Sequence, residues 1–248
     1  VMRYWFALLA ALLLLGCVAR ERVEVDRYSL ITTPKVSVGE DAHPPILHSD
    51  EFEDPEPLPF PVNTAGAEDS PFITPDGNTL YFFYTPDPNI PVEEQVLDGV
   101  TGLYVSRKEA GGWGEPERLW LIEPGKYAMD GCHFVQGNEF WFCSVREGNY
   151  REIDFYLADC EGSDCSNWRN AGERLNVELG VGELHLWGDE LYFHKGAGDN
   201  YDLFVTRRVN GEWQDAEPLN EFNTRATEGW PFVSSNGNEL WFLRTVNG

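Results

Sequence analysis

Acidic residues precede each of four repeated strands and are the side chains of this sequence best placed to bind a ligand. The five residues are Glu68, Asp69, Asp130, Glu183 and Glu228. If the strand starts converge at one mouth of a central channel, a ring of carboxylates there could hold calcium through hard oxygen ligands, or bind a basic or sugar ligand. The alternative, which we favour, is that each acid accepts hydrogen bonds from turn amides or a neighbouring arginine. Calcium stays a candidate ion, and no other cofactor is expected.

Trp230 stands at the start of the fourth repeated strand. Its equivalent in the first repeat is Ser70, so the repeat does not require a tryptophan, and we expect Trp230 to lie at the channel mouth. His133 and His185 lie near the same strand ends but are offset by one place in the hairpin alignment. Because successive residues of a strand face opposite sides, we do not expect these histidines to share a metal site.

The sequence contains no recognisable catalytic motif. Ser144 and Ser234 lack the Gly-x-Ser-x-Gly context of a nucleophile elbow. A glycosidase would need two carboxylates held several ångströms apart across a pocket, and no such pair can be singled out among 42 acidic residues. We therefore assign no catalytic residue and lean towards a protein without enzymatic activity.

Four cysteines are expected to form two disulfides. They are Cys132, Cys143, Cys160 and Cys165. A two-residue hairpin turn centred between Gly137 and Asn138 places Cys132 directly opposite Cys143. Cys160 and Cys165 bracket a short polar loop and form the second pair. Four cysteines allow three connectivities, so this pairing is a hypothesis, and a zinc site is the competing interpretation.

The first residues are typical of an export signal. Arg3 precedes an apolar run at residues 4–15, which is too short to span a bilayer comfortably. The run ends in Leu-Leu-Gly before Cys17, which resembles a bacterial lipobox and predicts lipid attachment at Cys17. An ordinary secretory signal or an uncleaved anchor are the alternatives. We expect a signal peptide at 1–17, a tether at 18–49, and an exported lipoprotein facing the periplasm or the cell exterior.

The net charge of −24 excludes two classes of partner. Nucleic-acid binding needs clustered Lys and Arg to neutralise phosphates. Electrostatic adsorption to anionic lipids is disfavoured for the same reason. We expect no nucleic acid, and contact with the membrane only through the lipid anchor.

A repeat of about fifty residues determines the expected fold. Each unit has an apolar strand, a glycine turn and an aromatic strand, and the turn glycines are Gly77, Gly137, Gly188 and Gly237. Further strands are expected at residues 103–107, 155–159 and 203–207, each followed by a short strand that starts at Trp113, Trp168 or Trp213 and ends in leucine. Four short strands per unit predict an all-β β-propeller of four-stranded antiparallel blades at residues 50–248.

The motif of the first repeat resembles a known family. Residues 70–82, Ser-Pro-Phe-Ile-Thr-Pro-Asp-Gly-Asn-Thr-Leu-Tyr-Phe, are similar to the signature of TolB-type (WD40-like) β-propeller repeats of bacterial periplasmic proteins and lipoproteins. The fourth repeat matches well, while the second and third lack the Pro-Asp pair. The resemblance implies a propeller whose innermost strand starts at the Ser-Pro end. It implies no particular reaction, because propellers carry many functions.

The ring is expected to be incomplete. About four blades are represented, residues 52–58 are interpreted as an outermost strand without its blade, and the fourth repeat stops after two strands. We therefore expect a truncated sequence. An insertion at residues 85–101 lengthens a loop of the first blade, and it is either a recognition loop or a tolerated insertion.

These features predict a non-enzymatic propeller of the cell envelope that binds a protein or glycan partner. The alternative is a carbohydrate-active enzyme, a glycosidase or a lyase, with its site at the channel mouth. A calcium-stabilised structural module is a third interpretation.

Overall fold

The computed structural model describes residues 25–42, 44, 46–197 and 200–245. The proposed signal peptide and Cys17 lie outside the described residues. No helix within these ranges is long and apolar enough to cross a membrane.

The described chain forms four antiparallel sheets. The first contains β1 (Ala67–Ile73), β2 (Thr79–Thr85), β3 (Gly102–Glu109), β4 (Gly112–Trp113) and β5 (Glu117–Arg118). The second contains β6 (Ala128–Gln136), β7 (Glu139–Arg146), β8 (Asp154–Glu161) and β9 (Asp164–Asn170). The third contains β10 (Gly182–Trp187), β11 (Glu190–Ala197), β12 (Asn200–Val209), β13 (Glu212–Trp213) and β14 (Glu217–Pro218). The fourth contains β15 (Glu228–Val233) and β16 (Leu240–Arg244).

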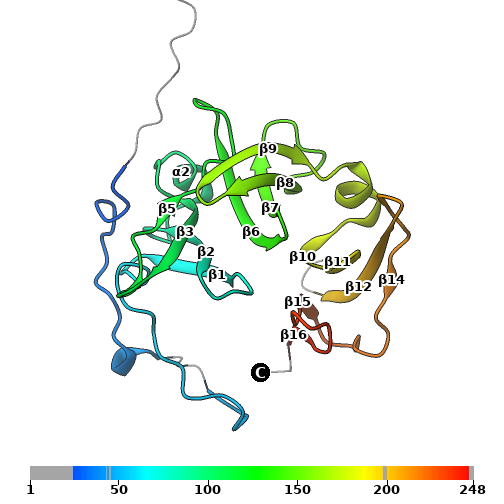
Figure 1. Ribbon diagram of the computed structural model, residues 1–248, viewed down its shortest axis with the longest axis horizontal. Coiled ribbons are helices and arrows are strands. Elements are labelled where there is room, and N and C mark those ends of the chain that lie inside the picture. The colour runs from blue at the N-terminus through cyan, green and yellow to red at the C-terminus, as the bar shows by residue number, and fades with distance from the viewer. Residues whose placement is uncertain (1–24, 43, 45, 198–199, 246–248) are drawn as a thin grey trace, which may run out of the picture.

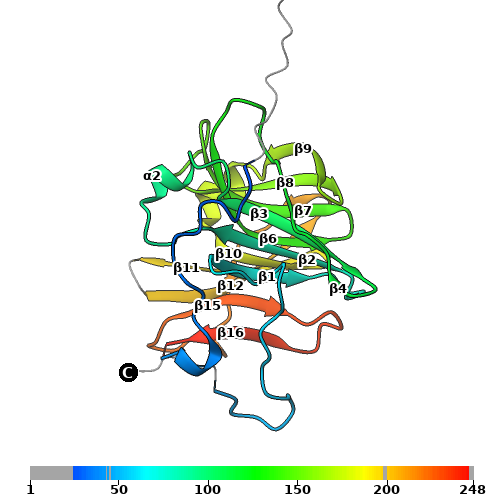
Figure 2. The same ribbon diagram turned by 90° about the vertical axis from the view of Figure 1, so that its left-hand side faces the viewer.

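The sheets follow one another in an arc, in the order of the sequence (Figure 1). The first strand of each sheet contacts the first strand of the next, so that β1 touches β6, β6 touches β10 and β10 touches β15. Seen from the side, the strands of the sheets run as stacked ribbons (Figure 2). The expected all-β class and the antiparallel sheets are confirmed; the second sheet has four strands, and the first and third consist of a path of four strands with one further short strand, β5 or β14.

Glycine turns set the register of each hairpin. Gly137 and Gly188 occupy the first central position of two-residue turns, with φ of 61° at both, a conformation that glycine adopts without a steric penalty. Gly77 and Gly237 lie in longer turns, where the side chains of Asp76 and Asn236 each accept a hydrogen bond from a backbone amide two residues later. In an Asx turn of this kind, the side chain supplies a hydrogen bond to the backbone where the two strands of the hairpin are not yet paired.

Aromatic and aliphatic side chains fill the spaces between sheets. One cluster joins the first and second sheets, and it includes Tyr81 and Phe140. Another joins the second and third, and it includes Trp141 and Phe193. Because β2 and β7 are covered on both faces, they lack the simple alternation of half-buried strands. Trp213 packs against this second cluster, and its ring centre lies 6.4 Å from that of Trp141.

A β-bulge near the start of each first strand changes the predicted register. We expected Cys132 opposite Cys143, but Cys143 pairs with Gly131, and Cys132 lies in the bulge. Phe134 pairs with Trp141 as predicted. Counting outward from the turn therefore fails beyond the bulge, because the bulged strand carries one extra residue.

Three other expectations need correction. Residues 52–58 form no strand, although the ring of Phe52 lies 6.0 Å from that of Trp241. The strand expected from Trp168 to Leu175 ends at Asn170, because the chain then enters a π-helical turn, η2 (Arg174–Leu179). The single short strands expected from Trp113 and from Trp213 are each divided into two strands of two residues, β4 and β5 in the first sheet and β13 and β14 in the third.

Part of the segment interpreted as a tether packs on the first sheet. It contains a 3₁₀ turn, η1 (Val38–Glu40). Upstream, Arg27 is 4% exposed, and its guanidinium lies 5.0 Å from the ring centre of Tyr84 and 5.6 Å from that of Tyr104. The Tyr84 hydroxyl donates to the Arg27 carbonyl oxygen. A buried cation over two aromatic rings anchors this segment.

The insertion at residues 85–101 is an ordered loop with a helical turn, α2 (Val92–Gln95). The carboxylate of Asp98 accepts hydrogen bonds from the amides of Val100 and Thr101, and the amide of buried Gln95 donates to the Ile90 carbonyl. These bonds close the loop on itself.

Candidate functional site

Four of the five predicted acids accept hydrogen bonds from local partners, and for Asp69 the donor is the backbone amide of Ser70 at 2.7 Å. Glu68 accepts hydrogen bonds from the amide and hydroxyl of Thr64. Glu228, which is fully buried, does the same for Thr224 and also pairs with Arg244 at 2.8 Å. Burial opposes ionisation of Glu228, but the Thr224 bonds and Arg244 outweigh it and lower its pKa. The pattern supports the architectural role that we favoured for these acids.

Asp130 occupies the position in the second sheet that Glu68 and Glu228 occupy in theirs. Its carboxylate accepts from the Ser144 hydroxyl at 2.7 Å and from the Arg146 guanidinium at 2.6 Å. The ion pair is largely buried. A neutralised, hydrogen-bonded acid of this kind stabilises the start of the strand and offers little to a ligand.

Glu183 is different from these acids, because it lies in the bulge of β10. Burial and, to a smaller extent, the neighbouring negative charge of Asp69 together raise the pKa of its carboxyl to about 7. Asp69 is exposed. The charge of Asp69 therefore acts on Glu183 from the first sheet to the third, and with a pKa of about 7 a large fraction of the Glu183 carboxyls is protonated at neutral pH.

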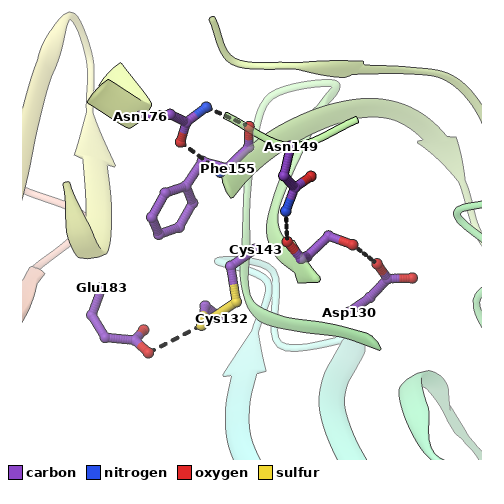
Figure 3. Close-up of a disulfide and its surroundings, with 8 residues drawn as sticks. Asp130, Cys132, Cys143, Asn149, Phe155, Asn176 and Glu183 are labelled. Atoms are coloured by element: carbon purple, nitrogen blue, oxygen red, sulfur yellow. Dashed lines mark hydrogen bonds between the residues drawn. A yellow bond between two sulfur atoms is a disulfide. The ribbon is translucent and has the colours of Figure 1, made fainter. Parts of the chain in front are cut away.

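The Cys132–Cys143 disulfide lies directly beside Glu183 (Figure 3). Its Cα atoms are 5.2 Å apart, and Cys132 has a φ of 47°. Oε1 of Glu183 lies 3.0 Å from Sγ of Cys132. A disulfide sulfur carries no hydrogen, so the protonated carboxyl must supply the hydrogen of this contact. The second predicted pair, Cys160–Cys165, is also a disulfide, with Cα atoms 4.1 Å apart.

Trp230 is the exposed member of an aromatic group. Its φ is 54°, its side chain is 47% exposed, and its amide donates to Nδ1 of His194 at 3.1 Å. The ring of His194 lies 5.0 Å from that of Trp230 and 4.7 Å from that of Tyr201. Burial lowers the pKa of His194 to about 4. The imidazole is therefore neutral at pH 7, with Nδ1 as acceptor and the hydrogen on Nε2.

These groups line one pocket of about 490 Å³ at the junction of the second, third and fourth sheets. Its walls contain the Cys132–Cys143 disulfide, Glu183, His194, Tyr201, Trp230, Lys195 and Arg151. A pocket of this size suits a small ligand or one unit of a larger one. It combines an aromatic face, a protonated carboxyl and a neutral imidazole.

The structure thus brings two predicted site residues, Glu183 and Trp230, to the same pocket, together with one predicted disulfide. Glu68, Asp130 and Glu228 are not among the residues that line it. His194 and Tyr201 were not predicted. Two glycines pack closely against the His194 ring, and they mark its place in the pocket. A Cβ on Gly182 would come within 2.9 Å of Nε2, and a Cβ on Gly229 within 3.0 Å of Nδ1.

The described residues contain no group of three or more His, Cys, Asp or Glu side chains that could hold a metal ion. His133 and His185 are both buried among aromatic rings, in separate surroundings. Calcium binding stays a prediction.

No protein-family model, curated protein or solved structure matches this chain. The resemblance to TolB-type repeats therefore stays a prediction from the sequence.

Proposed function

We propose that this protein is a non-enzymatic, lipid-anchored β-propeller of the cell envelope, related to TolB-type repeat proteins, that binds a glycan through the pocket around Trp230. The order of the four sheets and the contacts between their first strands support a propeller arrangement. The two disulfides support an oxidising, exported environment. The apolar run before Cys17 supports the anchor.

The observation that carries the glycan proposal is the exposure of Trp230. Its indole is 47% exposed although the backbone is held at a φ of 54° and the amide is bound to His194. A sugar ring has an apolar face that packs on an indole, and its hydroxyls need donors and acceptors nearby. Glu183 and Tyr201 in the pocket wall provide such groups.

Glycan-array binding of the wild type, Trp230→Ala and Trp230→Phe tests this proposal. We expect a discrete set of glycans for the wild type, about a tenfold loss of affinity for Trp230→Ala, and partial recovery for Trp230→Phe, because packing on an aromatic ring contributes on the order of 0.5–1.5 kcal/mol. An array without signal, together with a protein captured from envelope extract by the wild type but not by Trp230→Ala, would move the proposal to a protein partner. Binding that is unaffected by Trp230→Ala would overturn the pocket as the site.

A carbohydrate-active enzyme is the second candidate, and one observation favours it. Glu183 has a pKa of about 7 and lies in the electrostatic reach of Asp69, a carboxyl pair of the kind that could divide the acid and base roles. If the protein is a glycosidase, wild-type protein releases product from the bound glycans and Glu183→Gln does not. Intact glycans after long incubation with the wild type would reject this candidate and leave the binding proposal standing.

A further inference from the structure

The Cys132–Cys143 disulfide differs from Cys160–Cys165 in its surroundings. Both of its cysteines are among the residues that line the pocket, where Cys132 is partly exposed and Cys143 is 7% exposed. A carboxyl oxygen of Glu183 lies 3.0 Å from Sγ of Cys132 (Figure 3). The Cys160–Cys165 disulfide joins neighbouring strands of a hairpin, and Cys165 lines a separate pocket of about 600 Å³, but no described acid makes a hydrogen-bond contact with its sulfurs.

Thiol–disulfide exchange needs two things that this arrangement provides. An attacking thiolate must reach one sulfur of the disulfide, and the other sulfur must depart easily as the S–S bond breaks. A protonated acid next to the leaving sulfur assists its departure by transferring a proton as the S–S bond breaks. Glu183 is next to Cys132, so Cys132 is the assisted leaving group and Cys143 is the sulfur under attack.

We propose that the Cys132–Cys143 disulfide is a redox centre that exchanges with an external dithiol, with Glu183 as the acid that protonates the departing Cys132 sulfur. The thiolate of the dithiol forms a bond to Sγ of Cys143, and the bond between Cys143 and Cys132 breaks. The electron pair stays on Cys132, which takes the proton of Glu183. The second thiolate of the dithiol then displaces Cys143, which gains a proton from water. The dithiol is oxidised to its disulfide, both cysteines are reduced, and Glu183 recovers its proton from solvent.

The charge state of Glu183 makes the exchange dependent on pH. Burial and Asp69 keep the carboxyl protonated up to a pKa of about 7, so the acid is available below that pH and lost above it. The other charged or titratable side chains of the pocket wall are Arg151, Glu152, His194, Lys195 and Tyr201. Burial keeps His194 neutral down to a pKa of about 4, so its charge does not change over the pH range of the experiment.

The experiment measures the reduction of both disulfides in the same sample. The purified protein is incubated with dithiothreitol, free thiols are alkylated at intervals, and peptide mass spectrometry gives one rate for each disulfide. We divide the rate of reduction of Cys132–Cys143 by that of Cys160–Cys165. This ratio removes the effect of pH on the thiolate concentration of the reductant, because both disulfides meet the same reductant. We expect this ratio to fall about tenfold between pH 6 and pH 8.5 in the wild type, and to be low and independent of pH in Glu183→Gln.

Glu161→Gln is the matched control, because Glu161 is an exposed acid next to Cys160 in the sequence. It should leave the ratio and its pH dependence as in the wild type. A wild-type ratio that does not change with pH, or a Glu183→Gln ratio equal to that of the wild type, would overturn the proposal. The wild-type pH profile decides the matter even if Glu183→Gln fails to fold, and resistance of Cys132–Cys143 to the reductant at every pH would also exclude it.

Discussion

At the scale of single residues, the position of a carboxyl within the bulge decides what it does. Glu68, Asp130 and Glu228 precede the bulge and are held by hydroxyls, amides or arginines. Glu183 lies inside it, against a disulfide, where burial favours the protonated form. The sequence analysis gave these four acids the same role. Glu183 lies two positions further along its strand than the other three acids do along theirs, and the sequence pattern does not reveal this offset.

Glu183→Gln is expected to stabilise the protein at alkaline pH. The unfolded chain releases the proton near pH 4.5, whereas the folded protein holds it up to about pH 7, so the folded state loses stability as pH rises across this window. The glutamine variant lacks this penalty. We expect its free energy of unfolding at pH 8 to exceed that of the wild type by about 2 kcal/mol, measured by chemical denaturation.

The difference should disappear at pH 4, where both states of Glu183 are protonated. Glu161→Gln should follow the wild type at both pH values, because Glu161 is exposed. A glutamine variant that is less stable than the wild type at pH 8 would contradict the protonated, buried carboxyl.

At the scale of elements, the bulges are the feature that positions the site. They set Ser70, Cys132 and Trp230 at positive φ, with values of 51°, 47° and 54°. Residues other than glycine adopt this region at a cost, so packing between sheets must hold them there. The alternation of apolar residues along the strands predicted the hairpins. It could not reveal the extra residue in each bulge, because the conformation of that residue depends on the neighbouring sheet.

Gly182 and Gly131 occupy equivalent places before the bulges of β10 and β6, and they make a matched pair. A Cβ on Gly182 would lie 2.9 Å from Nε2 of His194 and 3.0 Å from its backbone oxygen, whereas a Cβ on Gly131 would meet only a sulfur at 3.7 Å. We expect Gly182→Ala to lower the free energy of unfolding by about 1–3 kcal/mol through overpacking.

Gly131→Ala should change that free energy by less than about 0.5 kcal/mol. Both values are measured by urea denaturation. Because His194 binds the amide of Trp230, Gly182→Ala should also weaken ligand binding in the glycan array. Equal effects of the two substitutions would contradict the tight packing of Gly182 against His194.

At the scale of the whole molecule, buried histidines between the sheets make folding sensitive to acid. His133, His185 and His194 each have a pKa lowered to about 4 by burial. As the pH falls from 6.5 to 4.5, the three histidines take up protons in the unfolded chain but stay largely neutral in the folded protein. Among these four side chains, the folded protein takes up a proton mainly on Glu183. The unfolded state binds more protons, so stability increases with pH in this window.

We expect the free energy of unfolding at pH 5 to be at least about 2 kcal/mol lower than at pH 7. His133→Phe should reduce this difference, because the imidazole is buried and stacks on the ring of Phe140 at 6.1 Å, an arrangement that a phenyl ring can keep without titrating. Chemical denaturation at the two pH values measures both effects. Equal stability of the wild type at pH 5 and pH 7 would contradict neutral, buried histidines.

The sequence by itself determined the hairpins, the antiparallel sheets and both disulfides. Turn glycines and the alternation of apolar residues are local signals, and two cysteines that lie close in a hairpin can be paired from their spacing even though a bulge shifts Cys143 opposite Gly131. Only the tertiary structure decided which acids are architectural and which one faces a pocket. The pocket is built by residues from three sheets, among them Cys132, Glu183 and Trp230, so its composition depends on how the sheets pack and on bulges that local patterns do not encode.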